Sequence, residues 1–453
     1  MRSRINILVY ILISSFLLAP AYGAIKEPSG SCKILNQTTI YKNYTYKCSI
    51  FGKRLIWKKY LKIVPKTPLP NPSPSKTVNP LIDIKNRISN RELFTDVTTC
   101  KLRSPYTDTF NSAVRIGFPR SDQRIPNIEN PKLLMIYIDY LDAKGTDNPL
   151  VDAPRIYSKF VDYFYSVSYG KSKWTVDVYP NYVHINKKMS EYNITDDRNY
   201  DVFNQIKDAI DAADSFVDMT KFDQIVFIPP INLIFPVGPA LQNMSDRIQY
   251  LTSSKGVLKN VAVAGLDWRN DDKAWLWLVH ETGHNYGLIH HSLDTDSGFT
   301  RPVWDAMAAM EINHSELFSW SRWLIGWIQD NEVECRKPSK TSTVHYISNL
   351  EHSDSETKMV VIPLSELTAI IVESRRNGGF DHLNLKEEGL LVYKLDVSKR
   401  MGEGAITMAK TTPTVADGSI LGNLSVGEIV EIEGVKIKYL ERGLSGDYFE
   451  VTA

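Results

Sequence analysis

The spacing of hydrophobic and polar positions divides the chain into regions with different predicted elements. Within residues 81–337, short apolar runs alternate with a segment of helical spacing. The predicted elements are strands at 133–138 and 174–179, a helix at 202–213 and a buried strand at 224–228. We therefore expect an α+β domain in which helices pack on a twisted mixed sheet.

The pattern changes in residues 338–453. Apolar runs of four or five residues are separated there by turn-forming residues, at Met359–Ile362, Ala369–Val372, Leu390–Tyr393 and Val435–Tyr439. Short runs of this kind predict a β-rich C-terminal domain.

The first residues of the chain predict an export signal. The basic start Met1–Arg4 precedes an apolar run from Ile5 to Pro20, and residues 21–24 supply the small side chains of a cleavage site. A retained membrane anchor is the alternative, but the run is shorter than the roughly 20 residues that span a bilayer. We expect residues 1–24 to be a signal peptide and the mature protein to be secreted, without membrane association.

Two further segments separate this signal from the α+β domain. Residues 25–63 contain several strand-forming residues and predict a small cysteine-containing module. The prolines of residues 64–80 favour an extended chain with no apolar face to bury, so this segment is a predicted linker.

The four cysteines favour disulfides, because an even number of cysteines in an exported chain is typical of bridged proteins. The sequence permits three pairings. A bridge between Cys32 and Cys48 would close a short loop within the small module. Cys100 and Cys335 would then join the beginning of the large domain to its far end.

Composition adds few constraints. Hydrophobic residues make up 43% of the chain and charged residues 23%, which is ordinary for a globular protein. The formal net charge of +1 gives no reason to expect binding to nucleic acid or to an anionic membrane. We predict neither partner, and the sequence does not specify an oligomeric state.

The strongest chemical signal is the stretch HETGHNYGLIH from His280 to His290, which has the form H-E-x-x-H-x-x-G-x-x-H. Histidines four residues apart project from one face of a helix, so His280 and His284 can bind a single metal ion. Glu281 lies on an adjacent face, where it can act as a general base toward an attacking water.

Gly287 explains how a third histidine can join the other two. A residue without Cβ can adopt positive φ, end the helix and turn the chain back, so that His290 becomes a ligand. Three nitrogen ligands with a fourth position left open are typical of a catalytic zinc ion. The alternatives are a buried helix with merely hydrogen-bonded histidines, or an inactive domain that keeps its metal.

The elongated motif resembles that of the metzincin metallopeptidases, which also have a methionine turn beneath the metal. The resemblance assigns that role to Met307, and Met310 is the competing candidate. Some metzincins place a tyrosine two residues after this methionine. Here that position is Ala309, so no tyrosine is assigned.

Other segments resemble the immune inhibitor A-like group of secreted bacterial metallopeptidases, namely 117–120, 138–140, 168–171, 217–223, 324–327, 372–375 and 389–396. The resemblance spans about residues 95–453 and does not cover the small module. It implies a metzincin-like catalytic domain at 81–337 and a β-rich domain at 338–453. Some members of the group have no obvious third histidine, so His290 is assigned from the metzincin pattern.

Several other polar residues are weaker candidates. His291 is an alternative ligand at the wrong spacing for the predicted turn, and His314 is more simply a structural histidine. Calcium prefers oxygen ligands, so Asp294, Asp296 and Asp305 could contribute to a calcium site. Their spacing is not that of an EF-hand, which favours roles in turns and caps.

Together these features predict a secreted zinc-dependent endopeptidase that hydrolyses proteins or peptides, with one catalytic zinc ion and Glu281 as general base. Two alternatives stay open. The chain could be an inactive exported binding or adhesion protein that keeps a peptidase fold, or a zinc amidase that acts on cell-wall peptide. The sequence does not specify which peptide bonds are cut or the physiological substrate, or whether residues 25 to about 94 are removed as a propeptide.

Overall fold

The structure is a computed structural model of the chain. It describes residues 31, 38–41, 44–51, 54–62, 93–106, 114–121, 124–127, 130–192, 202–231, 242–243, 251–258, 260–263, 274–291, 293–295, 298–308, 315–381, 388–410, 419–420 and 422–453. The predicted signal peptide, the predicted linker and Cys32 lie outside these residues. The chain forms two units, residues 1–77 and 78–453.

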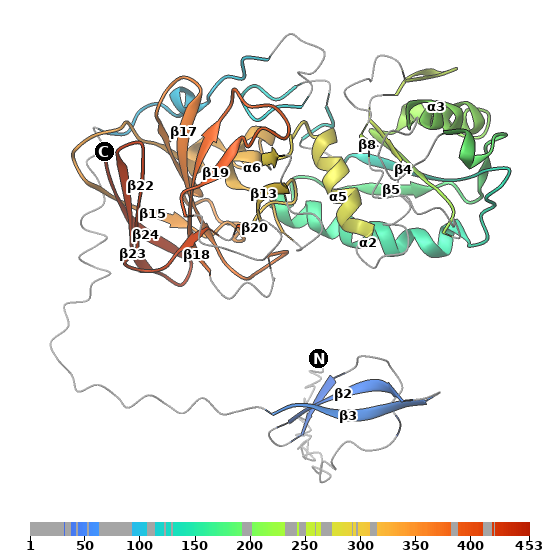
Figure 1. Cartoon of the computed structure of the whole chain (residues 1–453), viewed down its shortest axis with the longest axis horizontal. Helices are drawn as coiled ribbons and strands as arrows, with labels where there is room; N and C mark the ends of the chain where they lie inside the picture. Colours follow the sequence, from blue (N-terminus) through green and yellow to red (C-terminus); the bar gives the residue numbers. More distant parts are fainter. Residues whose placement is uncertain are drawn as a thin grey trace, which may run out of the picture. The chain divides into compact units, whose positions relative to one another are not determined.

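The N-terminal unit contains an antiparallel sheet in the order β1 (Thr38–Tyr41), β2 (Tyr44–Phe51) and β3 (Arg54–Lys62). The central strand β2 pairs with both neighbours and carries Cys48 and the buried Tyr46. The strand-forming residues noted in this segment thus lie in a small three-stranded sheet (Figure 1).

A mixed sheet forms the first part of the larger unit. Its path is β5 (Thr175–Val178), β4 (Lys132–Asp139), β7 (Gln224–Ile228), β11 (Val261–Val263) and β8 (Gln242–Asn243), and β6 (Val183–His184) pairs with the end of β4. Among the described strands of this sheet, β8 alone runs antiparallel to its neighbour. The central strands β4 and β7 are buried on both faces, as expected for parallel strands covered by helices.

Helices cover both faces of this sheet (Figure 1). On one face, α2 (Pro149–Val167) and α5 (Ala274–Asn285) share a hydrophobic core with Leu133, Met135 and Tyr137 of β4. On the other face, α3 (Val202–Ala213) packs with Ile136 and Ile138 of the same strand. No described helix is long and apolar enough to cross a membrane.

The sequence analysis missed α2, which lies between the first two predicted strands. Its buried side chains recur every three or four residues, at Ala153, Ile156, Phe160, Phe164 and Val167. The Asn148 side chain caps the helix by accepting a hydrogen bond from the Leu150 backbone N–H. Both signals were present in the sequence.

Two sheets form the C-terminal part, as the short apolar runs predicted. One follows the order β14 (Val333–Cys335), β16 (Met359–Pro363), β17 (Thr368–Arg375), β18 (Gly389–Asp396) and β19 (Ile406–Met408), with β21 (Asn423–Leu424) also on β18. The other follows β15 (Thr343–Ser348), β24 (Gly446–Thr452), β23 (Val435–Arg442) and β22 (Ile429–Ile432). Their facing apolar side chains form one core, for example Val372 and Val392 with Phe449.

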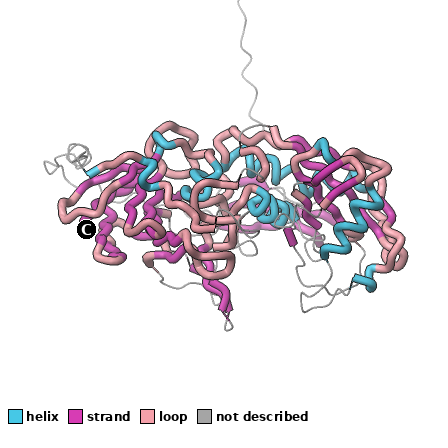
Figure 2. The backbone as a smooth tube through the Cα atoms, turned by 90° about the horizontal axis from the view of Figure 1, so that it is seen from above, coloured by secondary structure: helices cyan, strands magenta, loops and turns pink. Residues whose placement is uncertain are grey.

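The opposite face of the β17 sheet packs on α6 (Ser319–Ile325) through a second core that includes Ile371, Tyr393 and Trp320. Figures 1 and 2 both place the C-terminal strands at one end of this unit and the mixed sheet at the other. The helices α5 and α6 lie in between.

Short elements complete the described fold. They are the strands β9 (Thr252–Ser253), β10 (Gly256–Val257), β12 (Leu293–Thr295), β13 (Gly298–Pro302) and β20 (Ser419–Ile420), and the 3₁₀ helices η2 (Val97–Cys100), η4 (Met189–Tyr192), η5 (Met219–Lys221) and η7 (Asp330–Glu332).

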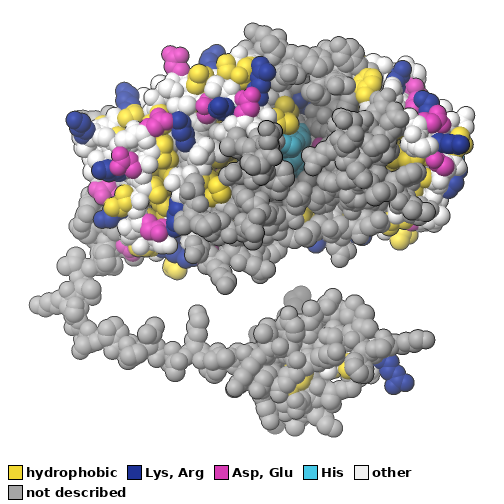
Figure 3. Space-filling model, in the orientation of Figure 1, with side chains coloured by type: hydrophobic (Ala, Val, Ile, Leu, Met, Phe, Trp, Pro, Cys, Tyr) yellow, Lys and Arg dark blue, Asp and Glu magenta, His cyan; other side chains and the backbone are white. Residues whose placement is uncertain are grey.

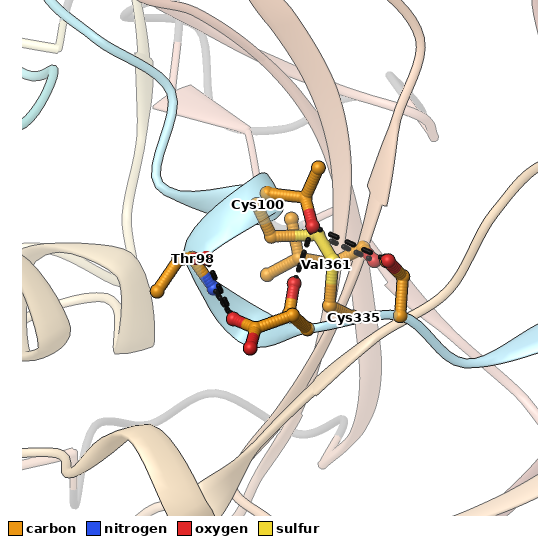
Figure 4. The surroundings of a disulfide bond; sticks show 7 residues. Thr98, Cys100, Cys335 and Val361 are labelled. Atoms are coloured by element: carbon orange, nitrogen blue, oxygen red, sulfur yellow. Dashed lines mark hydrogen bonds between the residues drawn. A yellow bond between two sulfur atoms is a disulfide. The ribbon is translucent and has the colours of Figure 1, made fainter.

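A disulfide joins Cys100, at the end of η2, to Cys335, at the end of β14 (Figure 4). Both cysteines are buried, and the Asp96 side chain caps η2 by accepting a hydrogen bond from the Thr98 backbone N–H. This disulfide confirms the predicted bridge from Cys100, near the beginning of the predicted α+β domain, to Cys335 at its far end. The suggested partner of Cys48 lies outside the described residues.

We expect the double substitution Cys100→Ala with Cys335→Ala to lower the free energy of unfolding by about 2–5 kcal/mol, because the unfolded chain gains freedom when a long loop is opened. Urea unfolding of the variant and the wild-type protein, both without reductant, measures the difference. Reduction of the wild-type protein should give a similar loss. An unchanged unfolding midpoint would contradict the expectation.

Candidate metal centre

The first part of the candidate metal-binding motif, His280–Asn285, lies on α5, a helix whose residues are all buried. Trp275, Leu276 and Trp277 belong to the first turn of this helix and to the hydrophobic core, and a helix that is apolar on every side is expected in the centre of a core. His280 and His284 lie one turn apart on this helix, as their spacing predicted. Their position is therefore set by the packing of the whole helix.

The three predicted histidines meet at one point. His290 Nε2 lies 2.8 Å from His280 Nε2 and 3.0 Å from His284 Nε2. Within the described part of the chain, no cysteine, aspartate or glutamate joins this group. His280 and His284 are buried, and His290 is partly exposed.

The other ring nitrogens define how these side chains are protonated. His280 Nδ1 lies 2.8 Å from the Ala306 carbonyl oxygen, and His284 Nδ1 lies 2.8 Å from that of Leu288. A carbonyl oxygen only accepts, so each Nδ1 must carry the hydrogen, and each Nε2 presents its lone pair to the centre.

This arrangement fits a cation better than a proton. If His290 Nε2 were protonated, it could donate to one of the two facing nitrogens and would leave the other unsatisfied. A metal ion accepts all the lone pairs at once, and metal-binding histidines commonly donate their second N–H to a backbone carbonyl. The residues present therefore fit a bound metal ion.

Burial and neighbouring charges disfavour protonation of two of the imidazoles, His284 and His290. Burial lowers the pKa of His284 well below its ordinary value, and the neighbouring His290 and His280 lower it further. Burial, together with His280 and His291, lowers the pKa of His290 to about 3. Deprotonated rings at neutral pH are what a metal ion requires.

Gly287 ends α5 in the left-handed conformation, with φ of 98°, which confirms the predicted end of the helix. Its N–H donates to the His284 carbonyl at 2.8 Å, and the Leu288 N–H donates to that of Gly283 at 3.0 Å. This turn directs the chain back toward the helix and brings His290 to the other two rings. It also places the Leu288 carbonyl next to His284.

Met307 packs against α5 at Gly283, which lies between His280 and His284 on that helix. It is fully buried, and a Cβ atom at Gly283 would overlap its sulfur. The absence of a side chain at Gly283 therefore allows this close approach. The competing Met310, together with Ala309 and His314, lies outside the described residues.

Asp305 shapes the turn that contains Met307. Its carboxylate accepts hydrogen bonds from the backbone N–H groups of Met307 at 2.7 Å and Phe318 at 2.6 Å. These contacts match the predicted capping role better than a role in a calcium site. Asp296 lies outside the described residues, and Asp294 is described only through its backbone in β12.

His291 does not belong to the group of three histidines. Its Nε2 lies 3.4 Å from Ser321 Oγ and 3.6 Å from Asp305 Oδ2, and its side chain is fully buried. The structure therefore places this alternative ligand against the Asp305 turn.

Glu281 is 3% exposed, and its Oε2 has no hydrogen-bond partner. Burial raises the pKa of this carboxyl to about 8. A nearby cation favours the ionised form and would lower that pKa, so the charge of Glu281 depends on metal binding. A buried carboxylate that is free of other partners can exchange a proton with a bound molecule.

Sequence reasoning missed three features of this site. The Ala306 and Leu288 groups that contact the histidines are backbone carbonyls, which every residue type has, so the amino-acid sequence does not reveal them. Arg124, whose charge also lowers the pKa of His284, comes from a loop more than 150 residues away in the sequence. Figure 3 shows histidine side chains at the surface near the middle of this unit, and His290 of the candidate centre is partly exposed.

Comparison of the chain with models of known protein families and with curated proteins finds no match.

We expect His290→Ala to weaken the binding of a divalent metal ion, with zinc as the probe, by more than about 100-fold, because changes outside the ligand shell already cost 10–100-fold. Competition with a chromophoric chelator measures the affinity. His291→Ala is the matched control: it removes a neighbouring buried ring that is not a ligand, so the metal affinity should fall by no more than the 10–100-fold typical of changes outside the ligand shell. Equal losses in both variants would contradict the assigned ligand set.

We expect Gly283→Ala to lower the free energy of unfolding by about 1–3 kcal/mol, because the added methyl group competes with Met307 for space. Met307→Ala should cost less in that background than in the wild-type protein. Urea unfolding of the two single variants and the double variant tests this coupling. Strictly additive costs would show that the two residues do not compete.

Proposed function

We propose that this chain is a secreted zinc-dependent endopeptidase of the metzincin kind, resembling the immune inhibitor A-like metallopeptidases. One observation carries the proposal: three imidazoles converge on a point, and the buried carboxyl group of Glu281 comes from the helix that carries two of them. The match of these residues, with Gly287, to the elongated metzincin motif adds to this support.

The donor set favours zinc. Imidazole nitrogen suits borderline metals such as zinc, whereas calcium and magnesium prefer oxygen. Three histidines without a fourth side-chain ligand among the described residues resemble a catalytic site, because structural zinc sites use four protein ligands. When bound, zinc supplies a Lewis acid that polarises a peptide carbonyl and makes a water molecule acidic near neutral pH.

Glu281 then carries the proton transfers. Its carboxylate takes a proton from the attacking water and delivers it to the leaving amine nitrogen, so one residue serves as base and then as acid. The unpartnered Oε2 supports this role, because no other group competes for it. His280, His284 and His290 hold the ion, and Met307 fills the space beneath them.

The remaining assignments follow from the sequence. Export through a signal peptide at 1–24 agrees with the buried disulfide, since such bonds persist in oxidising compartments. The proposed organisation is a small module at 25–63, a linker at 64–80, a catalytic domain at 81–337 and a β-rich domain at 338–453. The substrates are proteins or peptides.

We expect Glu281→Gln to retain one zinc ion per chain while peptide hydrolysis falls by about 10²–10⁴-fold, because the amide cannot accept the proton. Metal analysis and cleavage of a peptide library measure the two properties. A variant with near-normal turnover would refute Glu281 as the base.

The same assay separates the alternatives. The wild-type protein loaded with zinc should cut peptides, and a chelator should stop it. Absence of cleavage with zinc fully bound would favour an inactive binding protein. Cleavage of cell-wall fragments but not of ordinary peptides would favour the amidase.

A further inference from the structure

A second cluster of ligand-type side chains lies between the Met307 turn and the C-terminal sheet. One carboxylate oxygen from each of Glu316, Glu351 and Asp381 lies within 4.8 Å of the others. Glu316 is 1% exposed, Asp381 is fully buried, and the Glu351 side chain is 6% exposed. Three carboxylates so close together and so far from solvent need compensation.

Two nearby arginines compensate part of this negative charge. Arg322 pairs with Glu316, and Arg375 pairs with Asp381 at 2.6 Å and with the buried Glu373 at 3.1 Å. The described members of this network are thus four carboxylates, Glu316, Glu351, Glu373 and Asp381, and two guanidinium groups, Arg322 and Arg375. When all are ionised, two negative charges are left uncompensated.

The negative charge of Glu351 is the least compensated of the four. Its Oε1 accepts a hydrogen bond from the Arg376 backbone N–H at 3.1 Å, and Arg375 Nε approaches that oxygen only to 3.8 Å. Its Oε2 is buried and has no hydrogen-bond partner. The other two carboxylates of the cluster have closer cations: Arg322 pairs with Glu316, and Arg375 lies 2.6 Å from Asp381 Oδ2, although this oxygen also has no hydrogen-bond partner. Each also accepts a backbone hydrogen bond, Glu316 from the Phe380 N–H at 3.1 Å and Asp381 from the Glu316 N–H at 2.9 Å.

We propose that Glu316, Glu351 and Asp381 bind one calcium ion. A single divalent cation cancels the excess of two negative charges and gives Glu351 Oε2 a partner. The donors are all hard oxygens, which calcium prefers. Calcium binds oxygen at 2.3–2.6 Å with flexible geometry, so it accepts donors up to about 5 Å apart across the ion, whereas magnesium requires a tighter octahedron.

Such an ion would support the histidine site through the backbone. The Glu316 carbonyl accepts a hydrogen bond from the Ala306 N–H at 3.0 Å, and the Ala306 carbonyl faces His280 Nδ1. Glu316 therefore links the calcium site to a histidine ligand through one residue. The calcium site does not rest on the proposed peptidase activity, because the carboxylates and their charges are independent of the chemistry at the histidines.

The rival explanation is that protons neutralise the cluster. Burial and the neighbouring carboxylates raise the pKa of Glu351 well above its ordinary range, and burial raises that of Asp381 to about 7. Protons and calcium would fill the same role, so binding must be measured directly.

The experiment uses the full chain, loaded with zinc, freed of calcium and kept at pH 7.5. Equilibrium dialysis against radioactive calcium counts bound ions, and thermal unfolding measures stability with and without 2 to 5 mM calcium, a range chosen on the order of extracellular affinities. We expect Glu351→Gln to bind one calcium ion fewer than wild type and to lose the calcium-dependent rise in unfolding temperature. Glu332→Gln is the control, because this buried glutamate accepts a backbone N–H at 2.6 Å and lies outside the cluster.

Equal calcium stoichiometry in wild type and Glu351→Gln would overturn the proposal, as would a Glu351→Gln protein that is more stable than wild type with calcium present. Equal stabilisation by magnesium at the same concentration would overturn the choice of calcium. If Glu351→Gln does not fold, anomalous diffraction from calcium in wild-type crystals decides the question. A peak within coordination distance of Glu351 Oε2 supports the site, and its absence refutes it.

Discussion

The candidate metal centre depends on two hydrogen bonds from imidazole Nδ1 atoms to backbone carbonyls. They fix the tautomers and the orientations of His280 and His284, so that both lone pairs face His290. Each carbonyl is placed by a turn. The left-handed Gly287 presents Leu288, and the carboxylate of Asp305 holds the segment that presents Ala306. The chemistry of the side chains thus depends on the backbone at two separate turns.

The C-terminal sheets are part of this support. Arg375, in β17, donates to the Trp304 carbonyl at 2.8 Å and to the Leu317 carbonyl at 3.1 Å, on either side of the Met307 turn. Glu373, two residues earlier on the same strand, accepts a hydrogen bond from the Ser319 N–H at the start of α6. Both side chains are fully buried, so β17 contacts the turn through charged groups that water does not screen.

The spacing of residues along the chain predicted much of the candidate site. The parts that were not predicted depend mostly on contacts between distant segments. His280, His284 and Gly287 follow from the geometry of one helix and its end, and the apolar runs gave the main strands of the mixed sheet. The helix at 149–167 was missed although its periodicity is clear, and its Pro149 occupies the first turn, where proline is tolerated. The network around Arg375 joins residues with no regular spacing, so no local pattern could reveal it.

The covalent bond between Cys100 and Cys335 spans 235 positions and encloses α5 and the histidines. A single backbone cut anywhere inside that span leaves two fragments still joined. Self-cleavage within this region would therefore escape notice on a non-reducing gel, where the chain keeps its full mass. In a nicked molecule, Cys100 of one fragment stays bonded to Cys335 of the other, so the two fragments remain attached at β14.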